Sequence, residues 1–141
     1  MNKGNLAIVA VAAAMLSACG SAGPEEIPVT YGFLADVDIA TAQPTPGRRV
    51  DFVVEVRSTG NVPVMCDVIM SVVSDKGVEI YRQKWEDVKF EPASPWNLQN
   101  GFLPATDVEK SYKLSVEVRR STTGELLFSD GEVSRLEFSR L

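Results

Sequence analysis

Alternation of apolar and polar residues in two segments is the feature of this chain that most limits its fold. In Val50–Arg57 every second side chain is apolar, and Asp51, Glu55 and Arg57 lie on the opposite face. Tyr112–Arg119 repeats the pattern. A period of two residues is typical of a β-strand with one buried and one solvated face. No segment keeps helical spacing beyond two turns, so the sequence predicts an all-β fold.

Further strands and turns complete the pattern. Val62–Val73 has apolar residues at both odd and even positions, which is typical of a central strand covered on both faces. Polar turn sequences containing glycine predict hairpins at Ser74–Gly77 and Ser121–Gly124. The other expected strands are Phe33–Ala40, Val78–Tyr81, Trp96–Phe102, Glu125–Phe128 and Val133–Phe138. Seven or eight strands in about 110 residues indicate an antiparallel two-sheet β-sandwich.

The segment Tyr31–Leu141 resembles the immunoglobulin-like and fibronectin-type domains of bacterial envelope proteins. The resemblance is carried by Val50–Val56, the Asp75–Gly77 hairpin, and Phe102–Pro104 leading into Tyr112–Val118. It implies that the hydroxyl of Tyr112 bonds back to the preceding backbone. The Cys–Trp–Cys pattern of antibody domains is missing, and the resemblance implies a fold rather than an activity.

The N-terminus has the pattern of a targeting segment. Lys3 precedes the apolar run Leu6–Leu16, which as a helix would span roughly 16 Å, about half of a ~30 Å hydrocarbon core. The next residues, Leu16-Ser17-Ala18-Cys19, resemble the lipobox of bacterial lipoproteins. That resemblance implies cleavage before Cys19, a diacylglycerol on its thiol, and often a further acyl chain such as palmitate on the new amino group. The alternative is an ordinary secretory signal cut elsewhere.

The lipobox divides the chain into a signal peptide (1–18), a lipidated cysteine with a flexible tether (19–29) and the sandwich domain (30–141). Each buried methylene of an acyl chain is worth ~0.8 kcal/mol, so two or three chains hold a protein on a bilayer almost permanently. In the sorting pattern of enterobacterial lipoproteins an aspartate after the cysteine favours inner-membrane retention. The resemblance therefore implies that Gly20 favours the outer membrane in a bacterium with two membranes. We therefore expect a lipid-anchored protein of the bacterial cell envelope.

Composition excludes much chemistry. The net charge of −5 argues against nucleic acid as a partner, since binding phosphates needs clustered Lys and Arg. The chain has no histidine, so the usual general base and the commonest metal ligand are missing. No G-x-S-x-G sequence or zinc motif is present, although a Ser–Lys dyad stays formally open. We expect no enzyme, no cofactor and no resident metal.

Two acidic or thiol-bearing segments need an interpretation. Cys66, the remaining cysteine once Cys19 is acylated, lies in the most apolar segment and is expected in the core; an intermolecular disulfide and catalysis are the alternatives. Asp36 and Asp38 share one strand face and could bind Ca²⁺, but a solvated outer face is the simpler interpretation.

Trp85 and Trp96 are the most informative remaining residues. A sandwich buries a large aromatic side chain between its sheets, and a second, exposed one could stack on a sugar ring or anchor a protein interface. Trp85 has the more polar neighbours, so we expect it to be the more exposed, with Tyr81 close by in sequence.

Two functions follow from these features. The first is a non-catalytic accessory or scaffold module that binds an envelope protein through edge strands or loops. The second is a carbohydrate- or peptidoglycan-binding module that uses Trp85, Trp96 and Tyr81 on cell-wall glycan. A domain that inhibits proteases through its loops is a third alternative.

Overall fold

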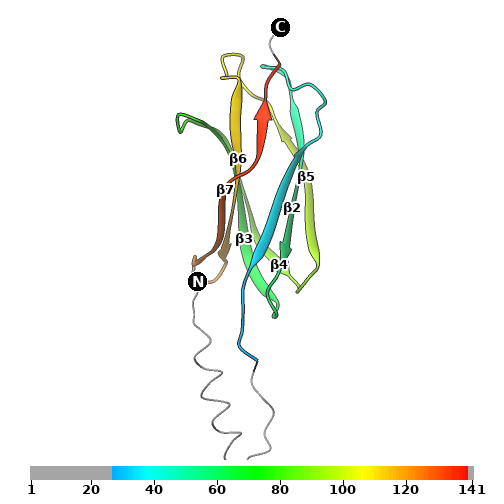
Figure 1. Ribbon diagram of the computed structural model, residues 1–141, viewed down its shortest axis with the longest axis vertical. Helices are drawn as coiled ribbons and strands as arrows, with labels where there is room; N and C mark the ends of the chain where they lie inside the picture. Colours follow the sequence, from blue (N-terminus) through cyan, green and yellow to red (C-terminus); the bar gives the residue numbers. More distant parts are fainter. Residues whose placement is uncertain (1–26, 140–141) are drawn as a thin grey trace, which may run out of the picture. The chain divides into compact units, whose positions relative to one another are not determined.

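The computed structural model describes residues 27–139, which form an all-β sandwich (Figure 1). The expected signal peptide and Cys19 lie outside the described residues, as does most of the expected tether. Seven strands follow one another along the chain: β1 (Phe33–Ile39), β2 (Val50–Ser58), β3 (Val64–Ser74), β4 (Glu79–Phe90), β5 (Pro95–Phe102), β6 (Ser111–Arg120) and β7 (Leu126–Glu137). Within residues 27–139 no helix could cross a membrane.

The strands form two antiparallel sheets, which confirms the predicted fold class. One sheet has the order β1-β2-β5, and the other has the order β4-β3-β6-β7. Strands β4 and β5 are consecutive in sequence but belong to different sheets, so the chain crosses between the sheets at Glu91–Ser94. In these two strand orders β4 and β5 each lie at an edge of their sheet.

The core lies between the sheets and follows the predicted alternation. In β2 the side chains of Val50, Phe52, Val54 and Val56 are buried, and β6 contributes its apolar set in the same way. In β3 the run Val68–Val72 is buried at both parities, as expected of a central strand. The expectation that Cys66 is a core residue is confirmed, since its side chain is fully buried.

Both predicted hairpins form, and each needs a glycine with positive φ. Gly77 has φ +89° and donates to the carbonyl of Ser74 at 2.9 Å. Gly124 has φ +76° and donates to the carbonyl of Arg120 at 2.8 Å. A side chain is strained in this region of backbone space, so glycine favours these turns over any other residue.

The hydrogen bond implied for Tyr112 is present. Its ring is buried against Phe138 in an edge-to-face contact, with the centroids 5.8 Å apart. Its hydroxyl accepts a hydrogen bond from the backbone N–H of Glu109 at 2.7 Å. The bond ties the loop before β6 to the strand, as in the tyrosine corner of immunoglobulin-like sandwiches.

Two strands differ from the expected ones. The expected strand Val78–Tyr81 is only the start of β4, which continues to Phe90 and contains Trp85. The expected strands Glu125–Phe128 and Val133–Phe138 are parts of one strand, β7, whose pairing with β6 is irregular between Leu114 and Val116. The irregularity accommodates the exposed segment between the two apolar parts, so the sandwich has seven strands.

Candidate binding site

The three aromatic residues singled out in the sequence lie along the side of the sandwich where β4 and β5 face each other. Tyr81 and Trp85 come from β4 and Trp96 comes from β5. All three are half-buried and pack against the core. We call this set, Tyr81, Trp85 and Trp96, the aromatic seam.

The structure brings the two tryptophans together across the gap between the sheets. The ring centroids of Trp85 and Trp96 are 5.7 Å apart in an edge-to-face arrangement, and Trp96 makes a second such contact with Phe90 at 6.2 Å. Trp85 is not the open, exposed ring that its polar neighbours favoured, since both rings are half-buried. They form an apolar anchor point rather than a separate open platform.

Tyr81 lies farther along the same face of β4 and is not in ring contact with the tryptophans. It stacks on Phe102 with centroids 4.7 Å apart and contacts Phe52 edge to face at 5.9 Å. Burial raises the pKa of its hydroxyl, while the nearby Arg49 guanidinium acts in the opposite direction. The phenol is therefore neutral at physiological pH and serves as a packing group with one polar end.

The edge of β5 beside the seam carries no charged side chain, unlike the other edge strands. Its sequence is PWNLQNGF, and the side chains of Asn97 and Gln99 point to solvent on the outer face of the sheet. Charged residues on the other edges are Asp36 and Asp38 on β1, Glu79, Arg82, Lys84, Glu86, Asp87 and Lys89 on β4, and Asp130, Glu132, Arg135 and Glu137 on β7. Charges on an edge strand oppose pairing with another chain, and β5 lacks that protection.

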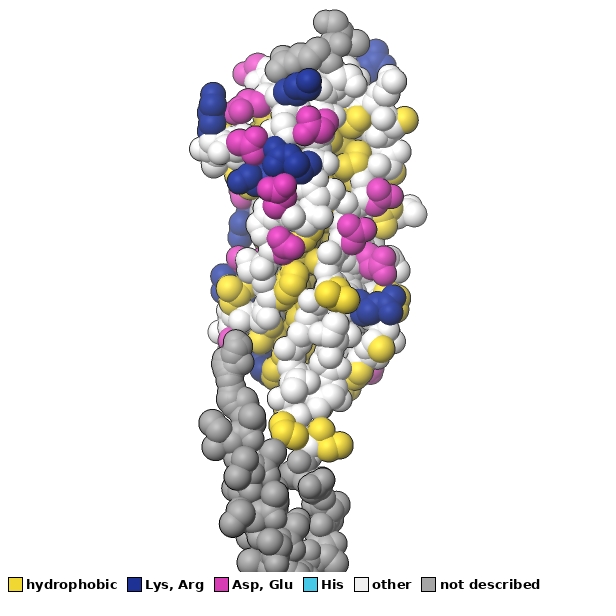
Figure 2. All heavy atoms as spheres, in the orientation of Figure 1, with side chains coloured by type: hydrophobic (Ala, Val, Ile, Leu, Met, Phe, Trp, Pro, Cys, Tyr) yellow, Lys and Arg dark blue, Asp and Glu magenta, His cyan; other side chains and the backbone are white. Residues whose placement is uncertain are grey.

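Charges elsewhere are largely paired locally. Arg135 lies 3.0 Å from Asp75, 3.3 Å from Glu132 and 3.7 Å from Glu137. Figure 2 shows acidic and basic side chains interspersed over the upper part of the face that it presents. Such exposed pairs contribute little to stability but leave no extended surface of one sign on that face.

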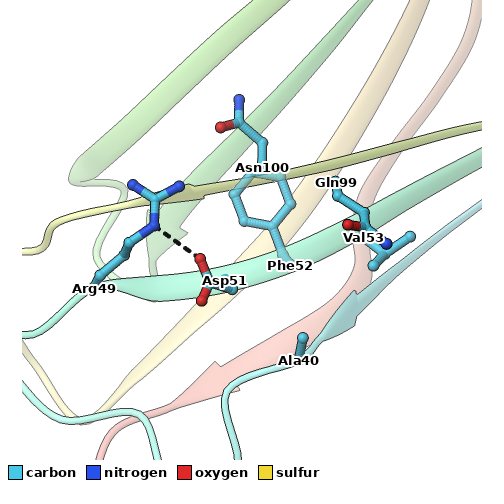
Figure 3. A pocket seen from close by; sticks show the side chains of 7 residues that line it. All are labelled: Ala40, Arg49, Asp51, Phe52, Val53, Gln99 and Asn100. Carbon is cyan, nitrogen blue, oxygen red and sulfur yellow. Dashed lines mark hydrogen bonds and ion pairs between the residues drawn. The ribbon is translucent and has the colours of Figure 1, made fainter.

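A pocket that the sequence did not reveal lies at the end of the three-stranded sheet where β2 begins and β5 ends. Its volume is about 370 Å³, and it is lined by Ala40, Arg49, Asp51, Phe52, Val53, Gln99 and Asn100 (Figure 3). Nothing in the pattern marks these residues, because they meet only when β5 pairs with β2 some fifty residues earlier in the chain.

The lack of a side chain at Gly101 leaves room for the ion pair on the polar rim of this pocket. Arg49 Nε donates to Asp51 Oδ1 at 2.8 Å, and this ion pair lies beside Gly101. A Cβ at position 101 would come within 2.6 Å of Asp51 Oδ1, 2.8 Å of Arg49 Nη2 and 2.7 Å of the backbone carbonyl of Val50. The absence of a side chain therefore makes room for the pair.

The remaining candidates have structural explanations. Burial raises the pKa of the Cys66 thiol to about 11, so it is protonated at neutral pH and is a poor nucleophile. Asp36 and Asp38 are exposed on either side of the buried Val37, as the alternation predicts. Within residues 27–139 no group of three or more acidic, cysteine or histidine side chains is placed to hold a metal ion.

No family model and no curated protein matches the chain, but its fold is common among solved structures. The C-terminal domain of wzt aligns over 80% of this chain and 77% of its own, with a TM-score of 0.58 and 15% identity. The fold is that of a β-sandwich domain. The CARDB domain of the PF1109 protein from Pyrococcus furiosus, solved with di-metal ions, aligns over 77% of this chain and 92% of its own (TM-score 0.53, 15% identity).

A sandwich similar to this one also forms a small part of a large enzyme. The Bacteroides uniformis beta-glucuronidase 2 matches over 74% of this chain but only 13% of its own length, with a TM-score of 0.55 and 12% identity. This chain therefore spans about one eighth of that enzyme. At these identities the likeness shows the fold alone, since one sandwich fold serves many activities.

Proposed function

We propose that this chain is a lipid-anchored protein of the bacterial cell envelope whose sandwich binds another protein and catalyses no reaction. The observation that supports the binding role most directly is the uncharged, unpaired edge of β5 beside the half-buried pair Trp85 and Trp96. Protein interfaces are depleted of charge at their centre and take much of their binding energy from aromatic anchors. A free strand edge adds main-chain hydrogen bonds.

In this proposal, anchoring depends on Cys19. Acyl chains on its thiol and amino group hold the protein on a bilayer. Gly20 after the cysteine favours the outer membrane as that bilayer. The twelve residues from Cys19 to Thr30 reach at most about 40 Å when extended, so the domain stays close to the membrane surface. The substitution Cys19→Ser should release the protein from the membrane fraction.

The binding role can be tested with a photo-crosslinking amino acid in the full chain, expressed in the bacterium that encodes it. Position Asn97 lies on the outer side of β5, and Asp36 is also exposed, on the outer side of β1 in the same sheet. We expect a discrete covalent adduct with one protein at position 97 and none at position 36. Identical adducts at both positions, or none at either, would refute the proposal.

Glycan binding remains a second candidate, but at a different place from the one expected. The packing of Trp96 between Trp85 and Phe90 leaves the tryptophans poorly suited as a flat stacking surface. The pocket at Arg49 and Asp51 is of a size that binds small ligands, and its charged and amide groups suit sugar hydroxyls. Titration of the full chain with cell-wall oligosaccharides, followed by NMR, should shift the Gln99 amide if sugar binds there. No change in the wild-type spectrum would eliminate this candidate.

A further inference from the structure

The direction of the backbone groups on β5 can be worked out from hydrogen bonds on β2. Ala40 donates to the carbonyl of Asp51, and the N–H of Asp51 donates to Thr41 Oγ1, each at 2.8 Å. The backbone of Asp51 therefore faces β1. Because these groups alternate along a strand, the even-numbered residues of β2 face β5. The carbonyl of Ser58 accordingly accepts from Ala93 at 3.1 Å, just before β5 begins.

The same register shows which groups β5 leaves free. Trp96, Leu98, Asn100 and Phe102 lie opposite the even-numbered residues of β2 and bond to them. The backbone groups of Pro95, Asn97, Gln99 and Gly101 therefore point away from the sheet, toward the open edge.

Neither end of this edge offers a free N–H donor. Pro95 has no N–H to donate. The N–H of Gly101 is already bonded to Asn100 Oδ1 at 2.8 Å. The donors that β5 offers to an incoming strand are therefore the N–H groups of Asn97 and Gln99, on either side of Leu98.

We propose that the occupant of this edge is a second copy of this chain, whose β5 pairs antiparallel with the first about a two-fold axis at Leu98. In this register Asn97 of each copy lies opposite Gln99 of the other, and each of these two pairs exchanges both of its N–H···O bonds. Pro95 lies opposite Gly101 of the second copy, where one donor is absent and the other is already bonded. Every free N–H of the edge thus finds an acceptor. The two positions without a free N–H lie opposite each other.

Charge favours this strand over the other edges for self-association. The chain has a net charge of −5, so two copies repel each other at long range. Close approach is least costly along a strand without charged side chains, and β5 is such a strand. On the inner side, Leu98 would meet Leu98 of the second copy, and the half-buried ring of Trp96 would lose more of its contact with water.

The symmetry also limits the assembly. The same patch is used on both partners, so the interface closes on itself at two copies instead of extending into a fibre. The two three-stranded sheets would then form one continuous six-stranded sheet. This inference rests on the proposed protein-binding function of β5 and names the partner at that surface.

The register can be tested by disulfide formation in the full chain under oxidising conditions. Residues that face each other without exchanging hydrogen bonds have Cα atoms about 4.5 Å apart, which suits a disulfide. Leu98→Cys should therefore give a covalent dimer on a non-reducing gel. The single variants Asn97→Cys and Gln99→Cys should give none, but a mixture of the two should give a mixed dimer. Of the two native cysteines, Cys66 is fully buried, and Cys19 is replaced by serine in every variant of this test.

A proline variant tests the hydrogen bonds without touching the pairing with β2. Gln99→Pro removes an N–H that faces the open edge, and the symmetric dimer loses one such bond per copy. In a chain without an added cysteine, the dissociation constant of the Gln99→Pro dimer should rise by about tenfold or more. Circular dichroism checks that the variant still folds.

The outcomes separate the two proposals. The proposal that the partner is a second copy would be refuted if Leu98→Cys gave no covalent dimer. It would also be refuted if the single cysteine variants at positions 97, 98 and 99 gave equal amounts of dimer. If the photo-crosslinker at Asn97 still captured a different protein, the proposed function would stand. If it captured nothing, both would fail.

Discussion

The carboxylate of Asp67 should stabilise the sandwich measurably because it holds the irregular part of β4 in place. One of its oxygens accepts hydrogen bonds from the N–H of Asp87 at 3.0 Å and from the hydroxyl of Ser121 at 2.8 Å, and Lys84 lies 3.6 Å from the other. Asp87 has φ +55°, at a bulge where the register between β3 and β4 shifts. The Asp67 side chain is 15% exposed.

The size of the effect follows from the two hydrogen bonds. A bond to a charged group contributes roughly 1.5–3 kcal/mol when buried, but the partners here can regain water in the variant. We therefore expect Asp67→Ala to lower the free energy of unfolding by about 2 kcal/mol and Asp67→Asn by about 1 kcal/mol. Asp36→Ala is the control, because the Asp36 side chain is exposed and makes no hydrogen bond or ion pair with another described residue; its effect should stay within about 0.5 kcal/mol.

The pH dependence of the free energy of unfolding distinguishes an effect of the Asp67 charge from a loss of side-chain packing. The N–H of Asp87, followed by the Ser121 hydroxyl, holds the pKa of Asp67 below its usual value. A carboxyl with a lowered folded-state pKa stabilises above its unfolded pKa of about 3.9 and loses that contribution as the pH falls through the lower value. Urea unfolding of wild type and Asp67→Asn should therefore differ at pH 7 and converge in acid below pH 4. A stability difference between the two proteins that stayed constant from pH 7 to acid would refute this account.

Three further changes have clear expected outcomes. Tyr112→Phe removes the acceptor of the Glu109 N–H and should cost about 1 kcal/mol in urea unfolding with an unchanged m-value; no loss would show that the bond is dispensable. Cys66, with a pKa of about 11, should react with a thiol reagent at neutral pH only after unfolding, and rapid native labelling would contradict its burial. Gly124→Ala should cost about 1 kcal/mol because of its positive φ, whereas Gly131→Ala, with open space and no such φ, should be neutral in the same thermal unfolding assay.

Strands in the interior of the sandwich were predictable from sequence because the environment there is simple. Residues of β2 and β6 are buried on one face and wet on the other, so their alternation is nearly complete. β4 was largely missed because it lies at an edge, where its inner face is only half-covered and tolerates Gln83. The bulge at Asp87 then shifts the alternation within the same strand.

The candidate site was predictable in its residues but not in its geometry. Trp85 and Trp96 stand out as large aromatic residues with polar neighbours, yet their contact depends on β4 and β5 joining different sheets. No local pattern encodes that choice. The free groups of β5 and the pocket beside Arg49 depend in addition on the register between β2 and β5, which only long-range pairing sets.

The position of β1 has a mechanical consequence. In Figure 1, β1 (blue) starts at the lower end of the sandwich and β7 (red at its end) finishes at the upper end. After β7 the N–H of Ser139 donates to the carbonyl of Pro44. A force pulling the N-terminal segment away from the C-terminal end would therefore act along β1. All seven register pairs between β1 and β2 would bear the load together in shear, rather than opening one after another like a zipper.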